Sequence, residues 1–138
     1  MLDLFSGSGQ LGIEALSRGA ASCVFIDQSR TSVELIKTNL AKTGLAQQAR
    51  VAAMDASAFL KSTQDVFDII LLDPPYAMEG LEEILALCAK RISPVGVLIC
   101  ESAKNTRLPD AVGELTAKRE YRYGTTSLNV YRRPAEED

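Results

Sequence analysis

The residues with the clearest chemical meaning are Asp73-Pro74-Pro75-Tyr76, which follow the largely apolar run 67–72. Such a run is typical of a buried strand in a parallel sheet, and two prolines end it because each lacks an N–H and has a fixed φ. The carboxylate and the exposed carbonyls can accept two N–H bonds from an amine on a flat substrate, while the ring stacks on its face. The alternative interpretation is a turn that only ends the strand.

A second group of residues lies near the start of the chain, where a glycine-rich turn follows the apolar segment 2–5. Gly7, Gly9 and Gly12 match the G-x-G-x-x-G spacing, which permits close backbone approach to a ligand at a helix N-terminus but is a weak signal alone. Asp27 ends the next predicted strand, about 20 residues on, where a carboxylate can accept both hydroxyls of a ribose. Alternatively, Asp27 caps the following helix.

Asp55 ends the third predicted strand and would lie at the same edge of the sheet. Its side chain, or the N–H that follows, could reach an adenine. It could equally be the N-cap of a helix over 56–61, and the two interpretations are compatible.

Strands that alternate with helices predict an α/β fold: a doubly wound, mostly parallel, seven-stranded sheet with a C-terminal antiparallel hairpin. One domain over 1–133 and a disordered tail over 134–138 are expected. The predicted strands are 2–5, 23–27, 50–54, 67–72 and 95–100, with the hairpin over 119–123 and 127–132. The predicted helices include 13–18, 81–91 and 108–117.

The composition excludes several kinds of site. The chain has no histidine, which excludes a Ser-His-Asp triad and a histidine-ligated zinc site. Its three cysteines, Cys23, Cys88 and Cys100, lack metal-ligand spacing, so we predict reduced core thiols of a cytoplasmic protein and no metal. No apolar run approaches the roughly 20 residues of a membrane span, and we expect no signal peptide. The net charge of −3 gives no global attraction to nucleic acid, so RNA binding would need a local patch, another segment or a partner.

The combination of these motifs resembles the class I S-adenosylmethionine-dependent methyltransferases, and Asp-Pro-Pro-Tyr resembles the motif of those that methylate exocyclic nitrogens. The runs 2–20 and 67–76 are more closely similar to the RsmD-like family, over nearly the whole chain. That family methylates N2 of one guanine in bacterial 16S ribosomal RNA. The resemblance therefore implies a Rossmann-like fold, S-adenosylmethionine as cofactor with S-adenosylhomocysteine as product, and ribosomal RNA or the assembling small subunit as partner. A monomer without membrane contact is expected.

The resemblance also assigns roles to individual residues. Gly7 and Gly9 would line the methionine part of the cofactor, and Asp3 would orient that loop and the cofactor amine. Phe5 and Ser8 of the same loop would also bind the cofactor. The ribose and adenine would meet Asp27, Gln28, Asp55 and Ala56. The target base would be held by Asp73, Pro74, Pro75 and Tyr76.

The family carries a segment before the first strand, with basic residues that help to bind RNA, whereas this chain begins at the strand. Three functions stay open: the rRNA guanine-N2 methyltransferase, an amino-methyltransferase of DNA adenine or protein glutamine, and a truncated, non-catalytic module that binds S-adenosylmethionine. The match over 2–20 favours the first of these, and the intact glycine and acidic positions argue against the third.

Overall fold

The computed structural model describes residues 1–75, 78–104 and 106–134. Contacts divide the chain into two units, Met1–Thr63 and Gln64–Asp138. Tyr76 of the predicted catalytic element and residues 135–138 of the predicted tail lie outside the described residues. The expectations for them stay predictions.

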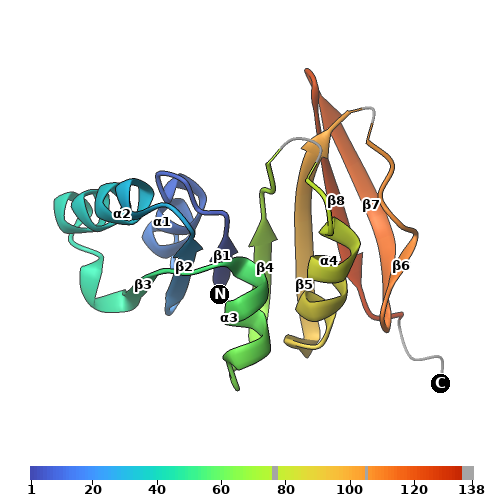
Figure 1. Ribbon diagram of the computed structural model, residues 1–138, viewed down its shortest axis with the longest axis horizontal. Coiled ribbons are helices and arrows are strands. Elements are labelled where there is room, and N and C mark those ends of the chain that lie inside the picture. Colours follow the sequence, from blue (N-terminus) through green and yellow to red (C-terminus); the bar gives the residue numbers. More distant parts are fainter. Residues whose placement is uncertain (76–77, 105, 135–138) are drawn as a thin grey trace. The chain divides into compact units, whose positions relative to one another are not determined.

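Strands and helices alternate through the first unit (Figure 1). Its strands pair in parallel in the order β3-β2-β1, with Leu4 opposite Ile26 and Asp27 opposite Ala53. The elements are β1 (Leu2–Leu4), α1 (Gln10–Ser17), β2 (Cys23–Asp27), α2 (Arg30–Thr43), the 3₁₀ turn η1 (Ala46–Gln48), β3 (Ala49–Ala53) and α3 (Ala56–Ser62). The parallel β-α-β pattern predicted from the sequence is present here.

The helix α2 shows how local sequence sets these bounds. Ser29 is its N-cap, and the Ser29 hydroxyl accepts a hydrogen bond from the Ser32 amide at 3.2 Å. Gly44 ends the helix in the left-handed conformation, with φ 74°. Ile36 and Leu40 point from α2 into a core cluster with Phe25 of β2. The apolar face of the helix is thereby buried against the strands that carry the glycine turn and Asp27.

The second unit begins with one parallel pair and continues in antiparallel pairs. Its strands run in the order β4-β5-β8-β7-β6, and the long β7–β8 hairpin lies beside β5 (Figure 1). The elements are β4 (Phe67–Leu72), α4 (Leu81–Ala89), β5 (Ile92–Ala103), β6 (Ala111–Val112), β7 (Leu115–Tyr123) and β8 (Thr126–Arg132). The C-terminal hairpin predicted from the sequence is confirmed.

The helix predicted over 108–117 is wrong. Ala111 and Val112 instead pair with Thr116 and Leu115 as a short hairpin, in which Gly113 turns with φ 58°. The described residues consequently form eight strands rather than the seven expected.

The three cysteines are free and buried, as predicted. Burial raises the pKa of the Cys23 and Cys100 thiols to about 12 and that of Cys88 further. Within the described part of the chain, no helix is both long and apolar enough to cross a bilayer.

Candidate functional site

The glycine turn between β1 and α1 is held in an unusual backbone conformation. Phe5, Gly7 and Gly9 all have positive φ, at 58°, 57° and 79°. The Gly9 amide donates to the Ser6 carbonyl at 2.8 Å, and the Ser6 hydroxyl donates to the carbonyl of Ile26 at 3.2 Å. Left-handed backbone at Phe5 is costly for a residue with a side chain, and such strain is typical of ligand-binding loops.

Asp27 joins this turn to the end of β2. Its Oδ2 accepts a hydrogen bond from the Gly7 amide at 2.9 Å, and its Oδ1 accepts one from the Ser29 amide at 2.9 Å. The alternative in which Asp27 caps the next helix is wrong, because Ser29 is the N-cap of α2. Each carboxylate oxygen retains a further lone pair, so Asp27 can organise the turn and also accept hydroxyl groups.

Asp3, on β1, is hydrogen-bonded to the start of the helix that follows the glycine turn. This residue is only 2% exposed, and its Oδ2 accepts a hydrogen bond from the Gly12 amide at 3.2 Å. A methyl group on Gly12 would lie 2.4 Å from Cε1 of Phe25 and 3.0 Å from that carboxylate. The third glycine of the motif therefore lets α1 approach β2 closely, which is a packing role.

Two further predicted residues, Asp55 and Ala56, lie at the start of α3. Asp55 is the N-cap of that helix, and its Oδ2 accepts from the Ala58 amide at 3.0 Å, so the capping interpretation holds. Ala56 is buried, whereas Gln28 after β2 is exposed. The Met54 amide donates to the Asp27 carbonyl at 3.0 Å, which brings the ends of β2 and β3 together.

Sequence reasoning missed Asn39, which holds the glycine turn from α2. Its Nδ2 donates to the carbonyl of Ser8 at 3.0 Å. The signal in the sequence was a polar residue next to Leu40 of the apolar stripe, and the structure shows it half-buried. All the residues predicted to contact the cofactor therefore lie in the first unit, at or near the carboxyl ends of β1, β2 and β3.

The predicted base-binding element lies in the second unit, where Asp73 follows β4 directly. Asp73 and Pro75 are exposed and Pro74 is half-buried. Burial of part of the carboxyl raises the pKa of Asp73. A hollow of about 80 Å³ adjoins the two prolines and is also lined by Glu101, Met78, Leu81 and Thr106.

Glu101 is the second residue that sequence reasoning missed. It follows the buried part of β5, and the pairing of Leu72 with Cys100 brings it beside Asp73. Burial and the Asp73 charge both raise the pKa of Glu101. A carboxylate whose ionisation is disfavoured by burial and by a neighbouring acid suits a substrate that donates N–H bonds.

Among the described residues, no group of three or more histidine, cysteine, aspartate or glutamate side chains could hold a metal ion. The arrangement therefore offers hydrogen-bond acceptors, a strained glycine turn and small hollows.

Comparisons with known proteins identify similar sequences and structures. A family model described as "Conserved hypothetical protein 95" matches residues 1–132. "Putative rRNA methyltransferase YlbH" of Bacillus subtilis is 36% identical over 96% of this chain and 74% of its own length. "Ribosomal RNA small subunit methyltransferase D" of Escherichia coli is 34% identical over 98% of this chain and 69% of its own length.

Solved structures give the fold. The crystal structure of SMU.776, described as "a putative methyltransferase complexed with SAH", superposes with a TM-score of 0.82 at 16% identity. The superposition covers 94% of this chain and 44% of the SMU.776 chain. The chain thus has the α/β Rossmann-like methyltransferase fold, with a mixed sheet and a C-terminal antiparallel portion.

Proposed function

The chain belongs to the RsmD/YlbH-like family, described as Conserved hypothetical protein 95, and from that premise we propose that it methylates ribosomal RNA. The methyl group comes from S-adenosylmethionine, and the acceptor is an exocyclic amine, N2 of a guanine in 16S rRNA. The names of the two relatives support an rRNA substrate. The exocyclic amine is inferred from the Asp73-Pro74-Pro75-Tyr76 element, and the choice of guanine rests on the similarity over residues 2–20.

The observation that carries this proposal is the position of Asp73. Its carboxylate follows β4 directly, part of its surface is desolvated, and Glu101 stands beside it on β5. A hydrogen bond from an N–H donor stabilises a partly desolvated carboxylate beside a second acid more than it stabilises a fully solvated carboxylate. An aromatic exocyclic amine provides two such N–H groups.

The cofactor fits the residues of the first unit. Asp27 would accept the ribose hydroxyls with the lone pairs that the Gly7 and Ser29 amides leave open. Gly7 and Gly9, with Phe5 and Ser8, would line the methionine part, and Asp3 would hold the loop for the cofactor amine. The adenine would meet the remaining residues, Gln28, Asp55 and Ala56.

In the mechanism, Asp73 and the carbonyl of Pro74 accept the two N–H bonds of the amine. These bonds favour the pyramidal nitrogen of the transition state, whose lone pair is no longer delocalised into the ring. Bound S-adenosylmethionine supplies a methyl group that is already electrophilic. Tyr76 stacks on the base, and Pro75 keeps the element rigid. No histidine is required, because the proton can leave after methyl transfer.

A base inside a helix must flip out or be unpaired before it can reach these acceptors. We therefore propose the small ribosomal subunit during assembly as the partner, with the enzyme acting as a monomer in the cytoplasm. Its buried, free thiols suit that reducing compartment.

The experiment is transfer of labelled methyl groups from S-adenosylmethionine to small-subunit particles that lack the modification, followed by nucleoside analysis. We expect N2-methylguanosine. Methylated adenine or glutamine would overturn the substrate while leaving the amino-methyltransferase class intact. Cofactor binding without methylation of any of these acceptors would overturn the enzyme assignment in favour of a binding module.

A further inference from the structure

A hollow of about 530 Å³ in the second unit collects positive charge, although the chain as a whole carries −3. It lies between the segment that follows β5 and the outer part of the β7–β8 hairpin. Two carboxylates, Asp110 and Glu120, also line it. Its cationic side chains are Lys104, Arg107, Lys118, Arg119 and Arg122. We call this hollow the basic groove.

A β-bulge explains how neighbouring cations of β7 reach the same groove. The register between β7 and β8 shifts between Ala117 and Arg119, which leaves Lys118 as the extra residue. In a regular strand, Lys118 and Arg119 would point to opposite faces, but at a bulge the alternation is broken. Both residues line the basic groove. Bulges that re-aim side chains are common beside functional sites.

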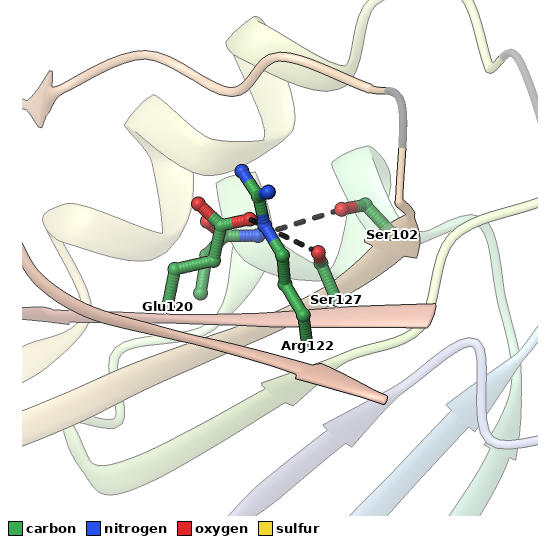
Figure 2. Close-up of polar contacts among 5 residues, drawn as sticks. Ser102, Glu120, Arg122 and Ser127 are labelled. Atoms are coloured by element: carbon green, nitrogen blue, oxygen red, sulfur yellow. Dashed lines mark hydrogen bonds and ion pairs between the residues drawn. The ribbon is translucent and has the colours of Figure 1, made fainter. Parts of the chain in front are cut away.

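Arg122 is fixed in the groove by a network of side chains (Figure 2). Glu120 Oε1 accepts from Nε of Arg122 at 2.6 Å and from the hydroxyl of Ser127 at 3.1 Å. Ser127 is only 1% exposed, so the network is anchored on the sheet. Glu120 uses Nε, which leaves the two terminal nitrogens of the guanidinium to bind a second anion.

Three other cations of the groove have no such partner. Lys104, Arg107 and Lys118 are exposed, and none forms an ion pair within the described part of the chain. The five cations of the groove outnumber its two carboxylates and repel one another, and a polyanion would relieve that repulsion.

The basic groove also leads toward the predicted base-binding element. Thr106 lines this groove, a second hollow of about 370 Å³ and the small hollow beside Pro74 and Pro75. Arg107 lines the first two of these hollows. An extended, single-stranded nucleic acid, with one phosphate charge per nucleotide, could therefore follow the groove while one of its bases lies at Pro74 and Pro75.

We propose that the basic groove binds the sugar-phosphate backbone of the substrate RNA next to the methylated nucleotide. This inference rests on the proposed function, and it supplies the local patch that an acidic chain needs to hold RNA. Single-stranded or splayed RNA fits it best, because a series of cations along a groove tracks a backbone without reading the bases.

The test compares two double variants with equal loss of charge. Arg107→Gln with Lys118→Gln removes two groove cations, whereas Lys42→Gln with Arg50→Gln removes two exposed cations of the first unit. The probe is fluorescently labelled, unmodified 16S rRNA made by transcription. We expect the groove variant to bind the RNA about tenfold more weakly than the wild type. The slope of log affinity against log salt concentration should become shallower by about 0.7 to 0.9 for each cation removed. The control variant should bind like the wild type.

Calorimetry with S-adenosylhomocysteine provides the second readout, and both variants should match the wild type because neither pair belongs to the cofactor residues. Equal RNA affinity of the wild type and the groove variant would overturn the proposal that the groove binds RNA. If the wild type still methylates rRNA in that case, the proposed function stands. Equally weakened RNA binding in both variants would also overturn this proposal, because the effect would then come from net charge and not from the groove. An acidic polyglutamate peptide that displaces RNA at equal charge concentration would reassign the groove to a protein partner. Failure of the wild type to methylate rRNA, with cofactor binding intact, would instead overturn the proposed function.

Discussion

Asp73, directly after β4, lies beside Glu101 of β5, one position beyond the register pair Leu72–Cys100. The negative charge of Asp73 helps to raise the pKa of Glu101, and burial raises the pKa of both carboxyls. The fold therefore tolerates an electrostatic cost at the point where the substrate amine is proposed to bind. Such a cost is typical of functional sites, where a ligand relieves it.

Glu101→Gln should stabilise the protein at neutral pH. A raised carboxyl pKa means that the folded state binds more protons than the unfolded one, whose pKa is near 4.5, so stability falls as the pH rises through the folded value. The gain at pH 7 should be about 0.2–1 kcal/mol, as for other solvent-screened charge pairs, and should vanish below about pH 4. Urea unfolding at both pH values measures it.

Glu120→Gln is the matched control for that measurement. Hydrogen bonds from Arg122 and Ser127 lower the pKa of Glu120, so its contribution has the opposite sign. This variant should lose stability at neutral pH and approach the wild type in acid. A gain in both variants would attribute the effect to net charge and contradict the Asp73–Glu101 interaction.

Asp27→Ala should weaken binding of S-adenosylhomocysteine by about 2–3 kcal/mol, because two hydroxyl bonds to a charged acceptor are lost. It also releases the Gly7 amide, so the glycine turn loses its tie to β2. Titration calorimetry measures the affinity. Ser29→Ala serves as control: it removes the cap of α2 and about 1 kcal/mol of stability but should leave the affinity unchanged. Equal affinity of Asp27→Ala and wild type would remove Asp27 from the site.

Gly12→Ala should destabilise the first unit by about 1–3 kcal/mol, the usual cost of overpacking. The new methyl group would lie 2.4 Å from Cε1 of Phe25, which is fully buried and cannot move aside. Phe25→Leu removes that ring edge, so the double variant should lose less than the two single losses combined. Strict additivity in denaturant unfolding would show that the contact with Phe25 is not the cause.

Local sequence was enough to predict the strands that carry chemistry. An apolar run followed by an acid places Asp27 and Asp73 at strand ends whatever the neighbouring strands are. The capping role of Asp55 was also available, because a cap depends on residues within one turn. These features need no knowledge of which strand pairs with which.

The remaining features depend on pairing that a single sequence does not contain. Glu101 lies beside Asp73 only through the register of β4 with β5, and the basic groove combines the bulged part of β7 with the segment after β5. The helix predicted over 108–117 failed for a similar reason. Val112 and Leu115 have apolar side chains that suit either structure, and their pairing across Gly113 decided for a hairpin.

The three cysteines should be unreactive in the folded protein. Burial raises the pKa of Cys23 and Cys100 to about 12, so almost no thiolate exists at pH 8. A thiol reagent such as Ellman's should label none of them in the native state and all three after denaturation without reductant. Rapid labelling of a native thiol would contradict its burial, and fewer than three labels after denaturation would indicate a disulfide.

Asp73→Ala should lower methyl transfer by about 10²–10³-fold, by analogy with removal of one oxyanion-hole donor. The reduction should fall mainly on kcat, because the bonds to the amine tighten as its nitrogen pyramidalises. Affinity for S-adenosylhomocysteine should stay near the wild-type value, since Asp73 is assigned to the substrate amine and not to the ribose or adenine. The measurement is single-turnover methyl transfer to unmodified small-subunit particles.

Asp68→Ala is the control on the same strand, an exposed acid whose loss should leave both readouts unchanged. Tyr76→Ala should weaken binding of the base by about 1–3 kcal/mol, whereas Tyr76→Phe should be mild because the ring provides the stacking. Full activity of Asp73→Ala would remove Asp73 from catalysis. A loss of cofactor affinity as large as the loss of rate would assign Asp73 to the cofactor instead, and the amine would then need another acceptor, for which Glu101 is the nearest described carboxylate on the adjacent strand.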